Sequence, residues 1–396
     1  MVHGRFFDAL GLIATVAIVA CMLTSWARAE SKEKVIYSFT DGSNGAIPSS
    51  PLTLGGAGNL YGEAGGVVSG VVFELEPRSN GYWKEKTFYA FGKDEGGPTG
   101  GLVLSESGTF YGVTFGGFFG SAGMVFGLPP FSVNPAIYSF ASDGPQAELV
   151  LDQAGNLYGT TEGGGPHDVG TVFELTHTSG GWNYEVLHNF GTTETDGYYP
   201  FAGLIIDAAG NLYGTTYEGG IYGAGTVFEL TNTGDGWTES VLYNFTGGDN
   251  GSGPLAGVIF DAKGNLYGTT PFGGSDDVGT VFQLTHSHGY WKHHVLYNFT
   301  GGDDGGLPYY VSLAMDDAGN LYGTTKYGGR LQYGTVFQLA QERPGKWKET
   351  VVHSFNGGHD GLNPIYGVIL DSAGNLYGTT PSGGADGWGV VFECIP

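Results

Sequence analysis

The chain of 396 residues repeats one short block of sequence seven times. The segment Gly-Asn-Leu-Tyr-Gly occurs six times, and Gly-Thr-Phe-Tyr-Gly is a weaker seventh copy. The copies begin at Gly58, Gly108, Gly155, Gly210, Gly264, Gly319 and Gly374. Each is followed by a version of Gly-Thr-Val-Phe-Glu/Gln-Leu, and a Tyr/His-x-Phe segment ends each unit. Because the copies are spaced by 47 to 55 residues along the chain, we expect one repeat architecture rather than several unrelated domains.

One unit, residues 254–299, predicts four strands. Its apolar runs are Leu255–Asp261, Asn265–Thr270, Gly279–Thr285 and Tyr290–Phe299, separated by turns rich in Gly and Asp. These runs are too short for helices, and no window keeps a helical period. Four strands in a unit of about 40–55 residues are typical of a propeller blade, whereas solenoid repeats are shorter or helical. The sequence therefore predicts an all-β, seven-bladed β-propeller with four antiparallel strands per blade.

The two ends of the repeat region complement each other. Lys34–Thr40 has the sequence of an outer strand without a unit before it, and the last unit stops at Pro396 without an outer strand. We expect the N-terminal strand to complete the last blade, which would cover both open edges of the ring. The predicted propeller spans residues 30–396. Its blades are expected at residues 46–91, 98–140, 145–190, 199–245, 254–299, 308–355 and 364–394, the last joined by 34–40.

Residues 1–29 are expected to be a secretory signal peptide and not part of the fold. Arg5 precedes the apolar stretch Ala9–Leu23, and Ala27–Ala29 provides a small-residue cleavage site. One alternative is an uncleaved membrane anchor. Another is lipidation of Cys21, because Ile18–Cys21 resembles a lipobox; only then would we expect contact with a membrane. The protein is predicted to be exported to the periplasm, the cell surface or the medium.

The charge of the chain limits its partners. Its formal net charge is −24, so its surface should repel phosphate backbones, and nucleic acid is excluded as a partner. Only Cys394 lies beyond the predicted signal, so no intramolecular disulfide is expected. Packing and ring closure must then supply the stability, and we expect a monomer.

The repeat also resembles a known family. The pattern Gly-Asn-Leu-Tyr-Gly-Thr-Thr, followed by Gly-Gly and Gly-Thr-Val-Phe-Glu-Leu, resembles the GloVer tandem repeat of secreted bacterial proteins, and residues 210–230 and 264–284 carry it almost unbroken. More loosely, it is similar to the Asp-x-x-Gly-Asn-Leu-Trp repeat of sensor-kinase propellers, with Tyr in place of Trp. The resemblance covers residues 34–396. It implies a propeller and export, and it implies no established catalytic activity.

Residue types that recur at one position in most blades are interpreted as scaffold, because a single site needs only a few of them. The Asp before Gly-Asn is expected to cap a turn, since calcium-loop spacing is absent. Its copies are Asp152, Asp207, Asp261, Asp317 and Asp371. A Glu or Gln on the third strand is expected to form hydrogen bonds, since the two types interchange. Its copies are Glu74, Glu174, Glu229, Gln283, Gln338 and Glu393. Tryptophans open the outer strands and are expected to pack between blades: Trp83, Trp182, Trp237, Trp291 and Trp347.

The loops are the predicted binding region. Loops from outer to inner strands, and from second to third strands, are expected on one face, and they combine carboxylates with aromatic rings. Aromatic rings stack on sugars and carboxylates accept their hydroxyls, while oxygen ligands would equally suit Ca²⁺. The candidate ligand-binding residues are Asp249, Asp303, Asp304, Asp360, Asp276, Asp277, Tyr309, Tyr310, Trp388 and Phe118. The alternative is that these are ordinary turns whose charge keeps the protein soluble.

Three functions fit this sequence. The first is an exported, non-catalytic binding module that contacts a glycan or a protein through an acidic, aromatic-rich loop face. The second is a carbohydrate-active enzyme, a glycosidase or lyase, that uses face carboxylates such as Asp249, Asp303 and Asp360. The third is a structural envelope protein without a small ligand. Local catalytic motifs are absent, so no catalytic residue is assigned, and Ca²⁺ is the one cofactor considered. The histidines of His286–His294 are interpreted as part of an opposite-face turn and not as a metal site.

Overall fold

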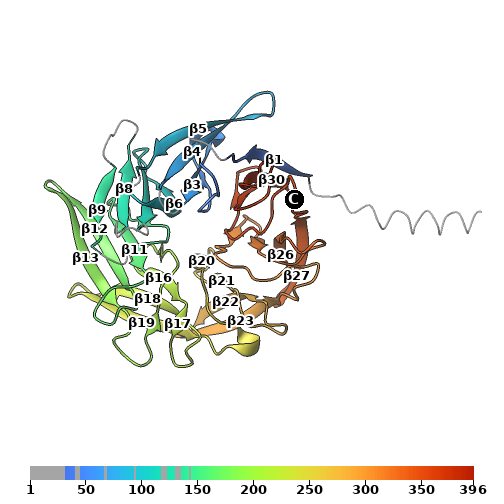
Figure 1. Cartoon of the computed structure of the whole chain (residues 1–396). Helices are drawn as coiled ribbons and strands as arrows, with labels where there is room; N and C mark the ends of the chain where they lie inside the picture. Colours follow the sequence, from blue (N-terminus) through green and yellow to red (C-terminus); the bar gives the residue numbers. More distant parts are fainter. Residues whose placement is uncertain are drawn as a thin grey trace, which may run out of the picture.

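Seven four-stranded antiparallel sheets lie around a central axis, like the blades of a propeller (Figure 1). This computed structural model describes residues 32–40, 45–66, 69–92, 95–116, 123–129, 135–141 and 144–396. The predicted seven-bladed β-propeller is thus confirmed. In the described ranges the only helices are two 3-10 turns, η1 (Gly56–Gly58) and η2 (Gly248–Asn250), and neither has the length or apolar character to cross a membrane.

Within each blade the strands follow one another from the axis to the rim. The innermost strands are β2 (Thr53–Leu54), β6 (Gly97–Leu104), β10 (Val150–Leu151), β15 (Ile205–Ile206), β20 (Ile259–Phe260), β24 (Ala314–Met315) and β28 (Ile369–Leu370). The second strands are β3 (Leu60–Gly66), β7 (Phe110–Phe115), β11 (Leu157–Thr161), β16 (Leu212–Thr216), β21 (Leu266–Thr270), β25 (Leu321–Thr325) and β29 (Leu376–Thr380). The third strands are β4 (Ser69–Pro77), β8 (Met124–Leu128), β12 (Thr171–Thr178), β18 (Thr226–Asn232), β22 (Thr280–Ser287), β26 (Thr335–Arg343) and β30 (Val390–Ile395). The outer strands are β5 (Trp83–Ala90), β9 (Ala136–Ser139), β13 (Gly181–Asn189), β19 (Trp237–Asn244), β23 (Tyr290–Asn298), β27 (Lys346–Ser354) and β1 (Lys32–Ser38).

Most inner strands are shorter than the sequence predicts. In the fifth blade only Ile259–Phe260 pair as a strand, where Leu255–Asp261 was expected. The preceding residues bond instead to the neighbouring blade: the Thr215 hydroxyl donates to the carbonyl of Ala256 at 2.9 Å. Equivalent threonine bonds of 2.8–3.4 Å join four other blade pairs. Near the axis, therefore, the chain links blades instead of extending one sheet.

The N-terminal strand closes the ring. β1 pairs antiparallel with β30, from Lys32 opposite Ile395 to Ser38 opposite Val390, with an irregularity between Val35 and Tyr37. Figure 1 shows β1 beside β30, at the junction of the first and last blades. The sheet order β1-β30-β29-β28 confirms that the N-terminal strand completes the seventh blade.

A ring of phenylalanine pairs forms the core between blades. Each Phe of the Tyr/His-x-Phe segment packs against the third-strand Phe of the next blade, with ring centroids 5.0–5.4 Å apart. The pairs are Phe39–Phe73, Phe91–Phe126, Phe140–Phe173, Phe190–Phe228, Phe245–Phe282, Phe299–Phe337 and Phe355–Phe392. Edge-on contact between two aromatic rings stabilises the interface beyond the contribution from burying two large apolar side chains. The first pair lies at the closing junction, so this core is continuous around the ring.

The recurring polar residues form a repeated scaffold, as predicted. Asp152 accepts hydrogen bonds from the amides of Ala154 and Asn156 and so caps its turn. The Tyr158 hydroxyl then links Asp152 to Glu174, at 3.3 and 2.9 Å. In two blades a glutamine donates to the tyrosine instead, through Gln283 or Gln338. One prediction was wrong by a residue: the capping Asp of the sixth blade is Asp316 and not Asp317, because its carboxylate accepts the amides of Ala318 and Asn320.

The tryptophans lie between blades, which confirms their predicted packing role. Four of the five contact the tyrosine of the Leu-Tyr-Gly or Phe-Tyr-Gly segment in the preceding blade, with ring centroids 5.9–6.3 Å apart, and Trp291 packs against the cluster that includes Tyr213 of the preceding blade. These pairs are Trp83–Tyr377, Trp182–Tyr111, Trp237–Tyr158 and Trp347–Tyr267.

Candidate functional site

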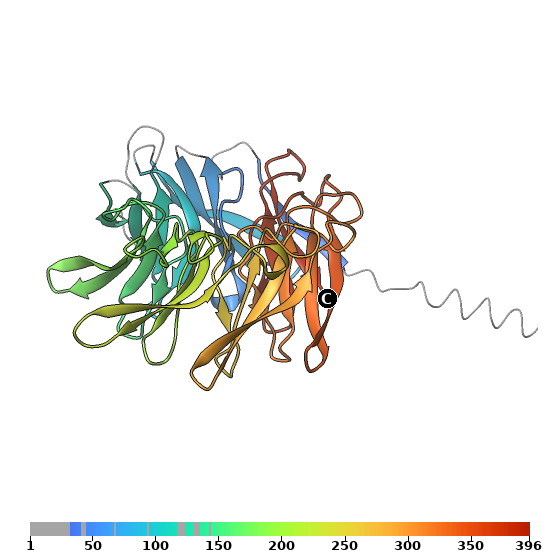
Figure 2. The same ribbon diagram turned by 90° about the horizontal axis from the view of Figure 1, so that it is seen from below.

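The two predicted sets of loops lie together on one face of the ring, called the loop face below. Backbone bridges join them in several blades, including the pair β14 (Gly197–Tyr198) and β17 (Glu218–Gly219). Single bridges do the same elsewhere, between Ser252 and Phe272 and between Gly306 and Tyr327. Figure 2 shows the outer hairpins of the green, yellow and orange blades projecting toward the opposite face. The expected single loop face is thus observed.

Three of the predicted ligand-binding carboxylates hold their own loops. Asp304 accepts the Thr300 amide at 2.9 Å and the Tyr297 hydroxyl at 2.8 Å. Asp360 is buried and accepts the Asn356 amide at 2.9 Å. Asp277 accepts the Gly273 amide at 3.0 Å from a left-handed backbone conformation. These contacts give each carboxylate a structural role within its loop.

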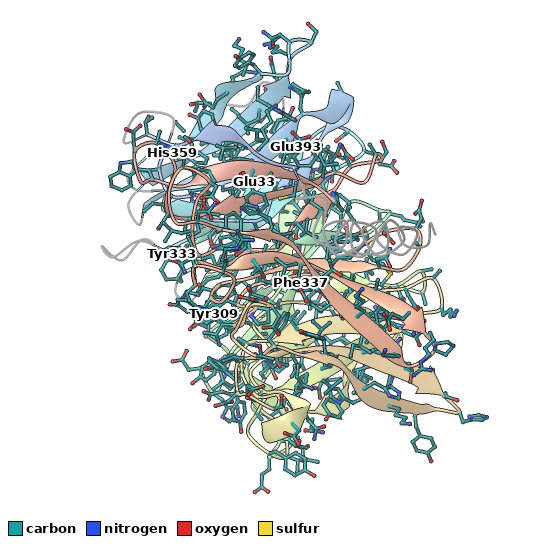
Figure 3. All side chains as sticks on the ribbon, turned by 90° about the vertical axis from the view of Figure 1, so that its right-hand side faces the viewer. Glu33, Tyr309, Tyr333, Phe337, His359 and Glu393 are labelled. Atoms are coloured by element: carbon teal, nitrogen blue, oxygen red, sulfur yellow. The ribbon has the colours of Figure 1, made fainter. Side chains whose placement is uncertain are left out.

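Four other predicted loop residues are exposed to solvent. Asp249, Asp303 and Asp276 are exposed, and so is Trp388. Among the described residues, no three of the predicted loop carboxylates bring ligand atoms within 4.8 Å of one another, so they do not form a preassembled Ca²⁺ site. Phe118, the predicted signal peptide and Cys21 lie outside the described residues. Figure 3 shows Tyr309, Tyr333 and His359 on one side of the ring, away from Glu393.

Aromatic rings gather where the loop face meets the axis. Tyr310 packs in parallel orientation on Tyr366 at 6.2 Å, and Tyr309 contacts Tyr310 at 5.3 Å. Burial raises the pKa of Tyr310, and the nearby charges of Glu162 and Tyr217 add to this shift. Tyr310 belongs to the sixth blade, whereas these two neighbours belong to the third and fourth blades. The geometry across the axis is given by the cavity below these rings, where Glu148 of the third blade lines the same space as residues of the sixth and seventh blades.

A cavity of about 360 Å³ lies on the axis below these rings. Its wall includes inner-strand residues of the first, sixth and seventh blades and Glu148 of the third. The inner-ring position of Glu148 holds only small residues or proline in the other blades: Pro51, Gly101, Gly203, Gly257, Ser312 and Gly367. A Cβ atom at Gly367 would lie 2.1 Å from the Ser312 carbonyl oxygen, so the ring leaves little room there. Glu148 is therefore the one carboxyl that this inner ring presents to the cavity.

The confinement of Glu148 changes its acidity. The side chain is exposed to the cavity, but protein surrounds the cavity, and this desolvation raises the pKa of Glu148 from 4.5 to about 7. The carboxyl is therefore partly protonated at neutral pH and can both donate and accept hydrogen bonds.

A second carboxyl, Glu63, lies beside Glu148. Glu63 occupies the position at which five other blades have a hydroxyl-donating threonine, and it is fully buried. One of its oxygens accepts the Gly101 amide at 3.0 Å, while Oε1 has no hydrogen-bond partner among the described residues. A Cβ atom at Gly101 would lie 3.7 Å from the carboxyl carbon of Glu148, so both acids adjoin Gly101. Burial raises the pKa of Glu63 well above its usual value, and the charge of Glu148 raises it further.

Neither acid was among the predicted site residues. The predicted site rested on residues that recur and on residues in loops, whereas these two acids are single substitutions within the repeat. The signal was nevertheless present: Glu63 replaces a recurring Thr, and Glu148 replaces a recurring small residue. When one blade has a charged residue at a position that is small or hydroxylated in the other blades, that residue is a candidate for a functional site.

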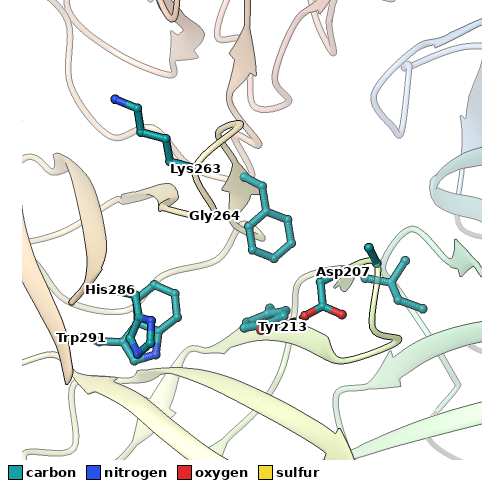
Figure 4. A pocket seen from close by; sticks show the side chains of 9 residues that line it. Asp207, Tyr213, Lys263, Gly264, His286 and Trp291 are labelled. Carbon is teal, nitrogen blue, oxygen red and sulfur yellow. Dashed lines mark hydrogen bonds between the residues drawn. The ribbon is translucent and has the colours of Figure 1, made fainter. Parts of the chain in front are cut away.

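The opposite face has a groove of its own between the fourth and fifth blades (Figure 4). It measures about 460 Å³, and its lining includes Tyr213, Lys263, His286 and Trp291. His286 packs on Trp291 at 4.9 Å, whereas His293 stacks on Tyr243 at 4.2 Å, and burial lowers the pKa of His293 to about 4. His286 and His293 thus pack on different aromatic rings. The groove is lined largely by residues that recur as scaffold.

We expect Glu63→Thr to raise the free energy of unfolding at pH 7 by about 1–3 kcal/mol. The substitution removes a buried carboxyl oxygen that has no hydrogen-bond partner, and it introduces the threonine hydroxyl that five other blades have at this position. The folded protein holds a proton on Glu63 that the unfolded chain releases above its ordinary pKa near 4.5. Wild-type stability should therefore fall as the pH rises above that value, and the gap to the variant should widen. Urea unfolding between pH 4.5 and 8 measures this gap.

Glu63→Gln is the matched control, since it keeps the size of the side chain and does not titrate. Its stability difference from Glu63→Thr should stay constant with pH. A gap between wild type and Glu63→Thr that does not change with pH would show that Glu63 does not bind a proton on folding.

The fold and the axial site define an all-β propeller with one asymmetric site at its axis. The chain belongs to the Gloeobacter/Verrucomicrobia repeat family, whose model matches residues 136–317 and 292–396. This agrees with the family resemblance found in the sequence. No curated protein matches the chain.

Solved structures share the fold. The extracellular domain of a hybrid two-component system from B. thetaiotaomicron is 11% identical with a TM-score of 0.54, over 91% of this chain and 39% of that one. The present chain thus spans about two fifths of that protein's length. A protein from Lactobacillus plantarum is 13% identical with a TM-score of 0.53, over 82% of this chain and 89% of that one. Identities this low support the shared propeller fold alone.

Proposed function

We propose that the protein is an exported, non-catalytic binding module that takes a saccharide at the axial mouth of its loop face. The observation that carries this proposal is an axial cavity that Glu148 of the third blade lines together with inner-strand residues of the first, sixth and seventh blades. The stacked rings of Tyr310 and Tyr366 directly precede two of these lining segments, and the fully buried Glu63 lies behind Glu148. The other blades keep the position of Glu148 free of any carboxyl, so the asymmetry belongs to the site and not to the scaffold.

The chemistry of the site suits a hydroxylated ring. Tyrosine faces stack on the apolar face of a sugar, and carboxyls exchange hydrogen bonds with its hydroxyls. Tyr217 packs on Phe201 at 5.6 Å and extends the aromatic rim into the fourth blade. The net charge of −24 favours neutral over anionic saccharides. The exposed acids Asp249, Asp303 and Asp276 would then contact a longer ligand at the outer loops.

Export is supported by the charged and apolar pattern of a secretory signal near the start of the chain. The family of secreted bacterial proteins that the repeat resembles agrees with it.

The second candidate is a carbohydrate-active enzyme, and the raised pKa of Glu148 favours it. Glycoside hydrolysis uses two carboxyls, one that holds a proton near neutral pH and one that is ionised, and the raised pKa of Glu148 suits the proton-holding acid. Glu63 lies beside it but is fully buried, so the ionised partner would have to be another residue.

We expect Glu148→Gly to weaken saccharide binding at least tenfold without lowering the melting temperature, because glycine is the residue of other blades at this position. Glycan-array screening followed by calorimetry on the tightest ligand measures the loss. Trp388→Ala, at an exposed outer loop, is the control and should bind nearly as wild type.

Three other outcomes would contradict the proposal, and each would support a different alternative. Loss of binding in Trp388→Ala but not in Glu148→Gly would move the site to the outer loops. Release of shortened sugars, abolished by Glu148→Gln, would establish the enzyme. Binding to no saccharide would favour the structural envelope protein.

A further inference from the structure

Three side chains of metal-ligand type meet at the rim between the third and fourth blades. His188 lies on β13, Asp196 in the loop that follows, and Glu239 on β19 of the neighbouring blade. One ligand atom from each lies within 4.8 Å of the other two. The axial site is formed by other residues, so this group is separate from it.

We propose that His188, Asp196 and Glu239 bind one Zn²⁺-like transition-metal ion. Zinc binds imidazole and carboxylate atoms at about 2.0–2.2 Å, which places two tetrahedral ligands about 3.3–3.5 Å apart. The Nε2 atom of His188 and Oδ1 of Asp196 are 3.5 Å apart. That separation is at the long end of a hydrogen bond or ion pair, and it also matches two ligands of one ion. A small shift of the Glu239 side chain would complete a three-residue site with one position open to water.

The surroundings hold these ligands in place. The Thr192 amide and hydroxyl donate to Oδ2 of the buried Asp196, at 3.0 and 3.1 Å. The Gly197 amide donates to Oδ1 at 2.8 Å, and the second lone pair of this oxygen remains for His188 or an ion. The His188 ring packs edge-on against Phe190 at 4.8 Å. Both ligands are therefore oriented before any ion arrives, because neighbouring groups hold the ligand side chains in place, as they do in other metal sites.

Glu239 is the third residue of the set. Its Oε1 atom is buried and has no hydrogen-bond partner among the described residues, although Asp196 and His188 are adjacent. Glu33, near Asp360 at the junction of the sixth and seventh blades, has an Oε1 atom in the same state, so what distinguishes Glu239 is its approach to both other ligands. A buried oxygen in this state costs free energy, and a bound cation would remove that cost. The imidazole in the set favours zinc-like metals, since Ca²⁺ requires six to eight oxygen ligands.

Two other blade junctions provide comparisons within the same chain. Tyr297 and Asp304 occupy the equivalent positions in the fifth blade, where the tyrosine hydroxyl donates to the carboxylate at 2.8 Å and no imidazole is present. His353 and Asp360 occupy them in the sixth blade, but there the separation is 3.2 Å, within hydrogen-bond range. In the described part of the chain, only the His188 set brings three ligand atoms within 4.8 Å.

The test uses purified protein without a histidine tag, stripped with chelator and titrated with Zn²⁺ at pH 7 by calorimetry. Co²⁺ absorption reports the ligand geometry, and circular dichroism confirms folding. We expect one ion per wild-type chain. His188→Tyr and Glu239→Gln should bind at least tenfold more weakly and lose the Co²⁺ spectrum. His188→Tyr introduces the residue that other blades have at this position and should fold.

His353→Tyr is the matched control and should leave the stoichiometry and affinity unchanged. The proposal is overturned if wild-type protein binds no stoichiometric Zn²⁺. It is also overturned if folded His188→Tyr binds as tightly as wild type, or if only His353→Tyr loses the ion.

Discussion

Removing residues 32–40 is expected to lower the free energy of unfolding by about 5 kcal/mol or more. The deletion removes the whole ladder between β1 and β30 and the buried side chains of Ile36 and Phe39, each of which contributes about 2 kcal/mol by burial alone. It also exposes one strand edge in the last blade. Because folded proteins are stable by about 5–15 kcal/mol, the truncated chain should melt at least about 10 °C lower or fail to fold.

The control is a chain that begins at residue 31 and keeps β1. It should melt at the temperature of the longer protein. Adding a synthetic peptide of residues 32–40 to the truncated chain should restore part of the lost stability, because the edge of β30 is left ready to pair. Equal melting temperatures with and without residues 32–40 would contradict ring closure by β1.

The second large effect concerns the ring of phenylalanine pairs. Phe245→Ala should lower the free energy of unfolding by about 3–5 kcal/mol, since a fully buried Phe is lost from a packed interface. Phe39→Ala should cost about the same, because Phe39 is equally buried and contacts Phe73 at 5.2 Å across the closing junction. Denaturant unfolding of the two variants measures both costs.

The relative cost of the two substitutions tests whether the core is continuous. Phe260→Ala, at a half-buried inner-strand position, should cost less than either and serves as the reference. If Phe39→Ala cost less than about 1 kcal/mol while Phe245→Ala cost the full amount, the closing junction would be weaker than the internal ones. The core would then not be continuous in solution.

Most of the fold could be predicted because the sequence repeats it seven times. Each recurring segment has a physical role, since the Phe of Tyr/His-x-Phe fills the interface and the Asp of Asp-x-x-Gly-Asn caps a turn. The lengths of the inner strands could not be predicted. They depend on hydrogen bonds between blades, such as Thr215 to Ala256, which a single unit of sequence does not reveal.

The candidate site was predicted only in part. Tyr309 and Tyr310 were expected on the loop face, and the structure adds that Tyr310 stacks on Tyr366 of the next blade. Asp304 and Asp360 looked equally suited to a ligand, but their carboxylates hold their own loops. Whether a carboxylate faces its loop or a ligand depends on three-dimensional packing. Glu63 and Glu148 were missed because the prediction relied on what the blades share.

The central claim is that a saccharide binds at the axial mouth beside Glu148. The most direct test is a crystal structure of the protein with the tightest-binding oligosaccharide of the array. We predict a sugar ring stacked on Tyr310 or Tyr366, with a hydroxyl within hydrogen-bond distance of Glu148. A sugar bound instead at the outer loops around Asp249 and Trp388, or in the groove of Figure 4, would contradict this claim.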